Sequence, residues 1–93
     1  QVEARPQALE WLFTVAAGRR FHLSMDNLAG EVPGQRERFA EKVHDEARRC
    51  LDEAMPPRAA RFLEALKAWY GTRRYFQGYA FTRAQLTGSE EVQ

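Results

Sequence analysis

The sequence predicts an all-α fold, a small bundle of three to four helices that forms a single domain over residues 1–93. Apolar residues recur at steps of three and four along most of the chain, which is the spacing of an amphipathic helix. Prolines and glycines stand at the borders of these stretches, where helices begin and end. Hydrophobic residues make up 44% and charged residues 29%, so the chain is apolar enough to fold. We expect one domain, either a subunit or an excised segment of a larger assembly.

The first helix is expected over about residues 6–17. Pro6 suits the first turn, where a missing N–H is not needed, and Gly18 suits a left-handed stop. The apolar stripe of this helix is Leu9, Leu12, Phe13 and Ala16. An irregular connection follows over 18–34, with a short helix in it that ends near Gly30.

The second helix, expected over 35–55, has the clearest amphipathic pattern. Its apolar face consists of Phe39, Val43, Ala47, Cys50, Leu51 and Ala54. The other face alternates in charge, and pairs such as Arg48 with Asp52 are four residues apart, as in a solvated helix. Pro56 and Pro57 end this helix and begin the next one.

Two more helices are expected, over 57–70 and 72–86, with Gly71 between them. The first of them is expected to bury Ala59, Phe62, Leu63, Leu66 and either Trp69 or Tyr70. From 72 to 86 both helical spacing and strand alternation can be drawn, and Gly78 weakens both. We favour a helix, because a lone strand would have no partner to pair with.

No catalytic or metal site is expected. His22, His44 and Cys50 form none of the spaced patterns that zinc sites need, and His44 fits the border of an amphipathic helix. Cys50 lies on an apolar face, where it resembles a small buried hydrophobe. We therefore expect a protein without enzymatic activity and without a cofactor.

A cytoplasmic location is expected, with no membrane contact. The longest apolar run, residues 11–17, is too short to span a bilayer. The chain has one cysteine, Cys50, so an intramolecular disulfide is impossible and a reducing compartment is the simpler assumption.

The C-terminal third combines basic and aromatic residues. Residues 69–83 contain six of the eleven aromatics, and residues 54–83 contain six cations and one acid. Arginine pairs with phosphate and aromatic rings stack on unpaired bases, so this composition favours nucleic-acid contact. The candidate nucleic-acid-binding residues are Arg58, Arg61, Lys67, Arg73, Arg74, Arg83, Tyr75 and Tyr79.

The sequence therefore predicts a small non-catalytic helical subunit of a larger assembly, of the ribonucleoprotein class, that contacts the backbone of RNA or single-stranded DNA. The alternative is a protein–protein interaction adaptor that docks through aromatic and arginine anchors and has no nucleic-acid role. Self-association fits the second hypothesis. At least half of the late rings are expected in the core, and their exposure decides how much surface is left for either role.

Overall fold

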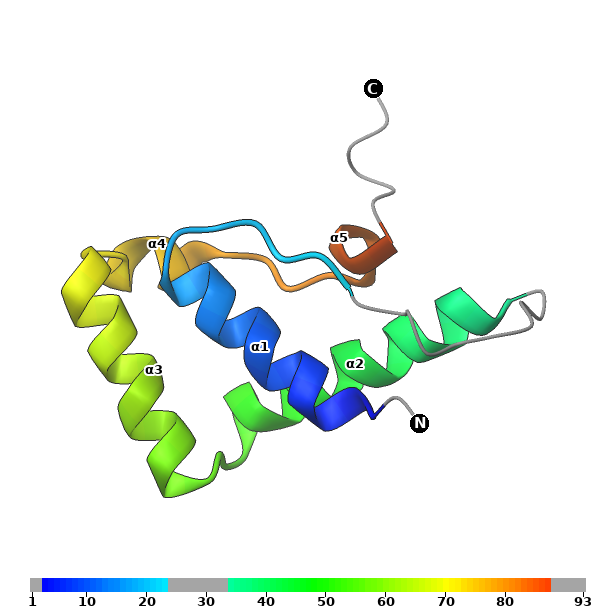
Figure 1. Ribbon diagram of the computed structural model, residues 1–93, viewed down its shortest axis with the longest axis horizontal. Helices are drawn as coiled ribbons and strands as arrows, with labels where there is room; N and C mark the ends of the chain where they lie inside the picture. The colour runs from blue at the N-terminus through cyan, green and yellow to red at the C-terminus, as the bar shows by residue number, and fades with distance from the viewer. Residues whose placement is uncertain (1–2, 24–33, 88–93) are drawn as a thin grey trace.

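A computed structural model describes residues 3–23 and 34–87, and all regular structure in these two ranges is helical. Within these ranges three longer helices are followed by two short ones (Figure 1). Their bounds are α1 Ala4–Ala16, α2 Gln35–Asp52, α3 Pro57–Tyr70, α4 Arg73–Gly78 and α5 Arg83–Thr87. The predicted all-α bundle is confirmed.

Helix α1 is the centre of the fold. It contacts α2, α3 and α4, and Figure 1 shows it between α3 and α2. Its buried residues are Ala8, Trp11, Leu12, Val15 and Ala16. Burial on several sides follows from a sequence in which apolar residues occupy most of the circumference of the helix. The buried side chains of α1 belong to a single hydrophobic cluster with those of the other helices.

Helix α2 packs one face on α1 and leaves the other in solvent. Phe39, Val43, Ala47 and Cys50 are buried, as the apolar spacing predicted. On the charged face, Arg48 lies 3.6 Å from the carboxylate four residues further along, a pair worth about 0.2 to 0.5 kcal/mol. The helix ends at Asp52, one turn before the predicted end.

Helix α3 begins at Pro57 and ends at Tyr70, the bounds that the sequence predicted. Gly71 follows with a φ of 64°, in the left-handed region that glycine adopts without a steric penalty. The hydroxyl group of Thr72 then donates a hydrogen bond to the carbonyl oxygen of Ala16. This bond fastens the turn after α3 to the C-terminal end of α1.

We expect Thr72→Val to destabilise the protein by about 1 to 3 kcal/mol, because it leaves the part-buried Ala16 carbonyl without this donor. Denaturant unfolding followed by circular dichroism measures the change. Thr14→Val is the matched control, since Thr14 makes an exposed hydrogen bond within its own helix. Equal stabilities for the two variants would contradict the expectation.

The predicted helix over 72–86 is divided into α4 and α5. Tyr79 has extended backbone angles, φ −75° and ψ 132°, and Gly78 precedes it at the end of α4. The extended stretch places Phe81 in the core, where its ring centroid is 4.9 Å from that of Trp11. The break therefore follows from burial of Phe81, which overrides the helical spacing.

The connection predicted as irregular is described only at its start. Residues 19–23 have no regular structure, and Phe21 is buried against α1. The short helix expected near Gly30 lies outside the described residues.

Candidate functional site

A cluster of aromatic rings brings together residues from the N-terminal and C-terminal parts of the described chain. Its members are Trp11, Phe21, Tyr75, Phe76, Tyr79 and Phe81. Phe81 is the hub, because it makes edge contacts with Trp11 and Tyr79 at centroid distances of 4.9 and 4.6 Å. Such pairs add about 0.5 to 1.5 kcal/mol each beyond the area they bury. The cluster fixes the position of Tyr79, which lines two hollows.

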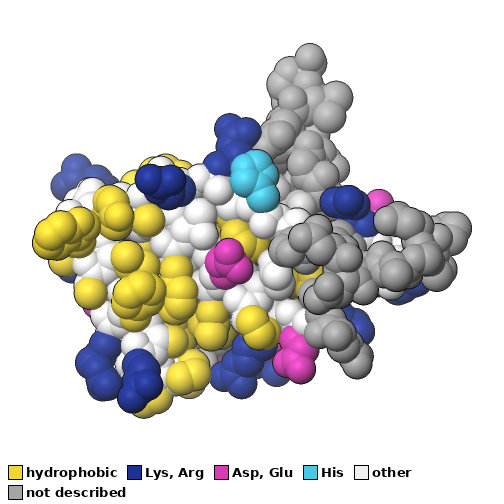
Figure 2. Space-filling model, in the orientation of Figure 1, with side chains coloured by type: hydrophobic (Ala, Val, Ile, Leu, Met, Phe, Trp, Pro, Cys, Tyr) yellow, Lys and Arg dark blue, Asp and Glu magenta, His cyan; other side chains and the backbone are white. Residues whose placement is uncertain are grey.

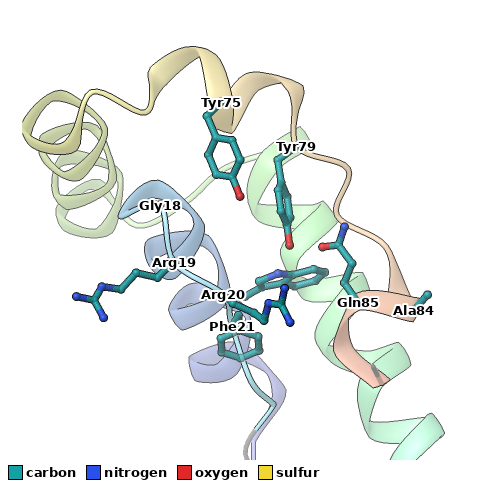
Figure 3. Close-up of a pocket in the computed structure, with 9 residues that line it drawn as sticks. Gly18, Arg19, Arg20, Phe21, Tyr75, Tyr79, Ala84 and Gln85 are labelled. Carbon is teal, nitrogen blue, oxygen red and sulfur yellow. The ribbon is translucent and has the colours of Figure 1, made fainter. Parts of the chain in front are cut away.

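The larger hollow, which we call the aromatic hollow, has a volume of about 450 Å³. It is lined by Trp11, Gly18, Arg19, Arg20, Phe21, Tyr75, Tyr79, Ala84 and Gln85. Figure 3 shows the hydroxyl groups of Tyr75 and Tyr79 directed toward Arg20, and the carboxamide of Gln85 extending from α5 toward the same space. The hollow thus has aromatic walls and several polar groups that converge.

Arginines are the charged residues in the described lining of the aromatic hollow. They are Arg19 and Arg20, and no acidic residue stands beside them among the lining residues of 3–23 and 34–87. Placing a cationic ligand about 6 Å from a guanidinium costs about 3 kcal/mol of electrostatic repulsion at the effective dielectric constant of a protein surface. A favourable contact between that added cation and the face of an exposed aromatic ring contributes only about 0.5 to 1 kcal/mol. A cation placed close to either guanidinium would therefore be repelled more strongly than the ring attracts it.

The smaller hollow has a volume of about 330 Å³ and shares Tyr79 with the aromatic hollow. Its lining includes Arg48, Leu51, Lys67, Arg73, Phe76, Gln77, Tyr79 and Phe81. Here the positive charges are paired. Glu64 accepts contacts of 2.8 Å from Lys67 and 2.7 Å from Arg73, and Arg48 pairs within α2. Because these charges already have acidic partners, the smaller hollow is the weaker candidate for a ligand site.

The hydrogen bonds of Glu64 make its contribution to the stability of the protein depend on pH. Hydrogen bonds from Lys67 and then from Arg73 hold the pKa of Glu64 below its ordinary value of 4.5. A carboxylate with a lowered pKa adds stability above the unfolded-state pKa and loses it as the pH falls through the folded-state pKa. The gain is small, since more than half of the side chain is exposed and solvent screens the pair.

We expect Glu64→Gln to lower the unfolding midpoint slightly at neutral pH, with a difference from wild type that disappears as the pH falls below about 4.5. Thermal unfolding at a series of pH values measures this. Glu53→Gln, on an exposed residue just after α2, is the control for removing a surface carboxylate. A Glu64→Gln difference that grows in acid would contradict the assignment.

The structure divides the predicted nucleic-acid residues among separate places. Tyr75 and Tyr79 line the aromatic hollow, while Lys67, Arg73 and again Tyr79 line the smaller one. Arg83 lies on α5 and pairs with Glu41 of α2 at 3.7 Å. The remaining three, Arg58, Arg61 and Arg74, are exposed and line neither hollow.

Sequence reasoning missed the residues that face Tyr75 and Tyr79 across the aromatic hollow. Arg19 and Arg20 follow directly after Gly18, and Gln85 lies on the last described helix. An arginine doublet just after a predicted helix stop was the only signal for this group in the sequence. Nothing in the spacing connects it to Gln85, which is more than sixty residues away along the chain.

Helix α3 buries less than the sequence predicted. Phe62 and Tyr70 are each 50% exposed and Trp69 is 83% exposed. The prediction of burial is therefore wrong for Phe62 and for both of the alternatives Trp69 and Tyr70, while Leu63 is buried. Helix α3 packs on α1 and on the short helix α4, which has only six residues, so much of its surface stays open. Phe62 touches Phe13 of α1 at 4.9 Å. Figure 2 shows hydrophobic side chains gathered on the side of the molecule where α3 lies.

The possible metal ligands in the described ranges are scattered. Residues 3–23 and 34–87 contain no group of three or more His, Cys, Asp or Glu side chains placed to hold a metal ion. His44 Nε2 lies 3.1 Å from the carbonyl oxygen of Phe81, and its Nδ1 lies 3.7 Å from Asp45. Cys50 is buried, as its apolar spacing predicted, and burial raises the pKa of its thiol.

Two comparisons with known proteins give the same result. Residues 1–80 match the family model of the elongation factor P hydroxylases, EpmC. The chain is also 40% identical over 72 residues to a protein of Haemophilus influenzae named elongation factor P lysine hydroxylase. That alignment covers 77% of this chain and 40% of the relative, so the chain spans less than half of the relative's length. No solved structure matches the chain significantly.

These matches overturn the functional predictions made from the sequence. Hydroxylases are enzymes, so the non-catalytic subunit, its RNA or DNA partner and the adaptor alternative are all wrong. The physical reason lies in the contacts of the basic and aromatic residues. Lys67 and Arg73 pair with Glu64, Arg83 pairs with Glu41, and several of the rings pack on one another. The local composition therefore predicted a phosphate-binding surface. In the folded chain, several of these cations form ion pairs with acids, and several of the rings contact one another.

Proposed function

Because this chain belongs to the elongation factor P hydroxylase family, we propose that the protein carrying it hydroxylates a lysine side chain of elongation factor P. The observation that supports this proposal is the family match over residues 1–80. The matched region includes α1 to α4 and most of the lining of the aromatic hollow. Ala84 and Gln85 are the described lining residues that lie beyond the matched region.

Hydroxylation of a C–H bond is an oxidation, and a metal or organic redox cofactor supplies that chemistry in enzymes. Non-haem iron oxygenases hold their iron with two histidines and a carboxylate. The described residues do not fit such a centre. His44 contacts the Phe81 carbonyl and Asp45, His22 is exposed on a segment without regular structure, and Cys50 is buried. We assign no oxidation step to these residues.

The described residues fit a role in binding and orienting the protein substrate. Ligand sites are usually concave, with apolar walls and a few convergent polar groups. The aromatic hollow has this form, and it lies where α1, α4, α5 and the segment after α1 meet. Holding a substrate in a productive position is itself a large part of enzymatic rate enhancement.

A cytoplasmic location is part of this proposal. Within the described ranges, no helix has both the length and the apolar composition that a membrane span requires. Cys50, the one cysteine of the sequence, is buried as a free thiol, which suits a reducing compartment.

Deleting the gene and analysing elongation factor P by mass spectrometry tests the proposal. The lysine-bearing peptide is expected to lose the mass of one oxygen atom in the deletion strain and to regain it when an intact copy of the gene is supplied. A copy with a stop codon within α1 is the control and should restore nothing. An unchanged peptide mass in the deletion strain would overturn the proposed function.

A further inference from the structure

The imidazole of His44 joins α2 to the segment between α4 and α5. Its Nε2 atom lies 3.1 Å from the carbonyl oxygen of Phe81, a residue 37 positions further along the chain. A carbonyl oxygen can only accept a hydrogen bond, so Nε2 carries the proton and is the donor. The side chain is 24% exposed, and the bond is therefore partly shielded from competing water.

The second ring nitrogen of His44 faces its neighbour in the sequence. Nδ1 lies 3.7 Å from a carboxylate oxygen of Asp45, which is longer than an ordinary hydrogen bond. A neutral ring with its proton on Nε2 leaves Nδ1 bare, and a charged ring carries a proton on both nitrogens. The donor to Phe81 is present in both states. The contact therefore works as a fixed link and needs no change of protonation.

The Phe81 carbonyl belongs to a segment that has no helix to hold it. Residues 79–82, between α4 and α5, have no regular structure, and backbone groups in such a segment need partners from elsewhere in the fold. The Phe81 ring is buried against Trp11, at a centroid distance of 4.9 Å. The ring contact restrains the side chain, and the His44 bond restrains the peptide group that follows it. Together they set the direction in which the chain enters α5.

This direction matters because the segment borders the aromatic hollow. Tyr79 lies two residues before Phe81, and Ala84 and Gln85 lie three and four residues after it. All three line the hollow, as Figure 3 shows. His44 itself is not among the described lining residues of either hollow. An effect of His44 on the hollow therefore passes through the segment that it holds.

From these contacts we propose that His44 is a positioning residue for the aromatic hollow. By donating to the Phe81 carbonyl, it keeps Tyr79 and Gln85 in place around the hollow. This inference rests on the proposed function, in which the hollow holds and orients the protein substrate. Loss of the bond is expected to slow hydroxylation, because a misplacement of about 1 Å in groups that position a substrate can cost about 100-fold in rate.

NMR spectroscopy of the full chain, labelled with ¹⁵N and ¹³C, tests the link itself. We expect the Nε2–H proton of His44 to be visible in water and to show a scalar coupling across the hydrogen bond to the carbonyl carbon of Phe81. His22 is the internal control, because its exposed imidazole is expected to exchange its proton with solvent too fast to be seen. A His44 ring with its proton on Nδ1 and no coupling to Phe81 would overturn the inference.

Two amide variants separate the hydrogen bond from the rest of the side chain. Glutamine places an N–H donor near the position of Nε2, whereas asparagine is one methylene group shorter and does not reach the carbonyl. In the deletion strain, we expect His44→Asn to lower the initial rate at which elongation factor P gains oxygen about tenfold. His44→Gln is expected to keep most of the wild-type rate. His44→Leu, which removes every polar atom of the side chain, should match His44→Asn and replaces it if that variant does not fold.

Two controls exclude a general loss of stability. Lys42→Asn introduces the same residue at an exposed position of α2 and should hydroxylate like wild type. Phe62→Ala removes a half-exposed ring of α3 that lines neither hollow, so it lowers the unfolding temperature without touching the segment after α4. Its rate of hydroxylation is expected to stay close to wild type. Thermal unfolding of each purified variant shows that it is folded.

Three outcomes in cells would overturn the inference: a wild-type rate in both His44→Asn and His44→Leu, an equal loss in His44→Gln, or an equal loss in Phe62→Ala. Failure here is distinguishable from failure of the proposed function. If the gene deletion removes oxygen from elongation factor P while His44→Asn hydroxylates at the wild-type rate, the function stands and the positioning role is wrong. If the deletion changes nothing, while the coupling to Phe81 is seen and the amide signals of Tyr79, Ala84 and Gln85 shift in His44→Asn, His44 positions the hollow of a protein with another substrate.

Discussion

Replacing Trp11 with alanine is expected to destabilise the protein by about 3 to 5 kcal/mol. Trp11 is 1% exposed, packs against Phe21 at 6.2 Å and meets the edge of Phe81 at 4.9 Å, distances that join ring centroids. Domains of this size have total stabilities of about 5 to 15 kcal/mol, so one such loss leaves little margin. Urea unfolding followed by far-ultraviolet circular dichroism measures the change.

The second tryptophan provides a matched control for the first. Trp69 is 83% exposed on α3, so Trp69→Ala is expected to change the free energy of unfolding by no more than about 0.5 kcal/mol. The two variants delete the same side chain from the same protein. Similar losses for both would contradict the central position of α1 in the core.

Phe81→Ala is expected to have the second large effect, about 3 to 5 kcal/mol, because Phe81 is the hub of the aromatic cluster. Its ring holds Tyr79 at 4.6 Å and Phe76 at 5.5 Å, and its carbonyl lies 3.1 Å from His44. Loss of the ring removes the support of Tyr79, a wall of the aromatic hollow.

Two further variants isolate the contribution of the hub. Phe81→Leu retains most of the buried volume and is expected to recover more than half of the lost stability. Phe62→Ala removes a ring that is 50% exposed and has one ring contact, with Phe13, and its expected cost is about 1 kcal/mol. If Phe62→Ala lowered the free energy of unfolding as much as Phe81→Ala, the aromatic cluster would not be the main source of stability at this end of the fold.

Helix borders were predictable where proline or glycine stands at them. Pro57 and Gly71 bound α3 at the predicted residues, and Gly18 follows closely after the end of α1. The helix over 72–86 was not predictable in detail, because its break depends on a tertiary contact. Local spacing favours a continuous helix there, whereas burial of Phe81 against Trp11 requires an extended backbone around Tyr79.

The site was predictable only in part. Composition pointed to Tyr75 and Tyr79, which do line the aromatic hollow. It could not show Gln85 and Arg20 beside them, since their approach depends on the turn after α1 and on the break before α5. Nor could it show that Glu64 neutralises Lys67 and Arg73. The hydroxylase family was visible only by comparison, because the described residues carry no pattern of redox chemistry.

The mass of elongation factor P from cells that make the double variant Arg20→Gln, Gln85→Leu tests most directly whether the aromatic hollow serves lysine hydroxylation. The matched control is Arg58→Gln, Arg61→Gln on the exposed surface of α3. We predict that the lysine peptide from the hollow variant lacks the added oxygen, as in the deletion strain, while the control retains it. Full hydroxylation in the hollow variant, with none in the deletion strain, would contradict the account.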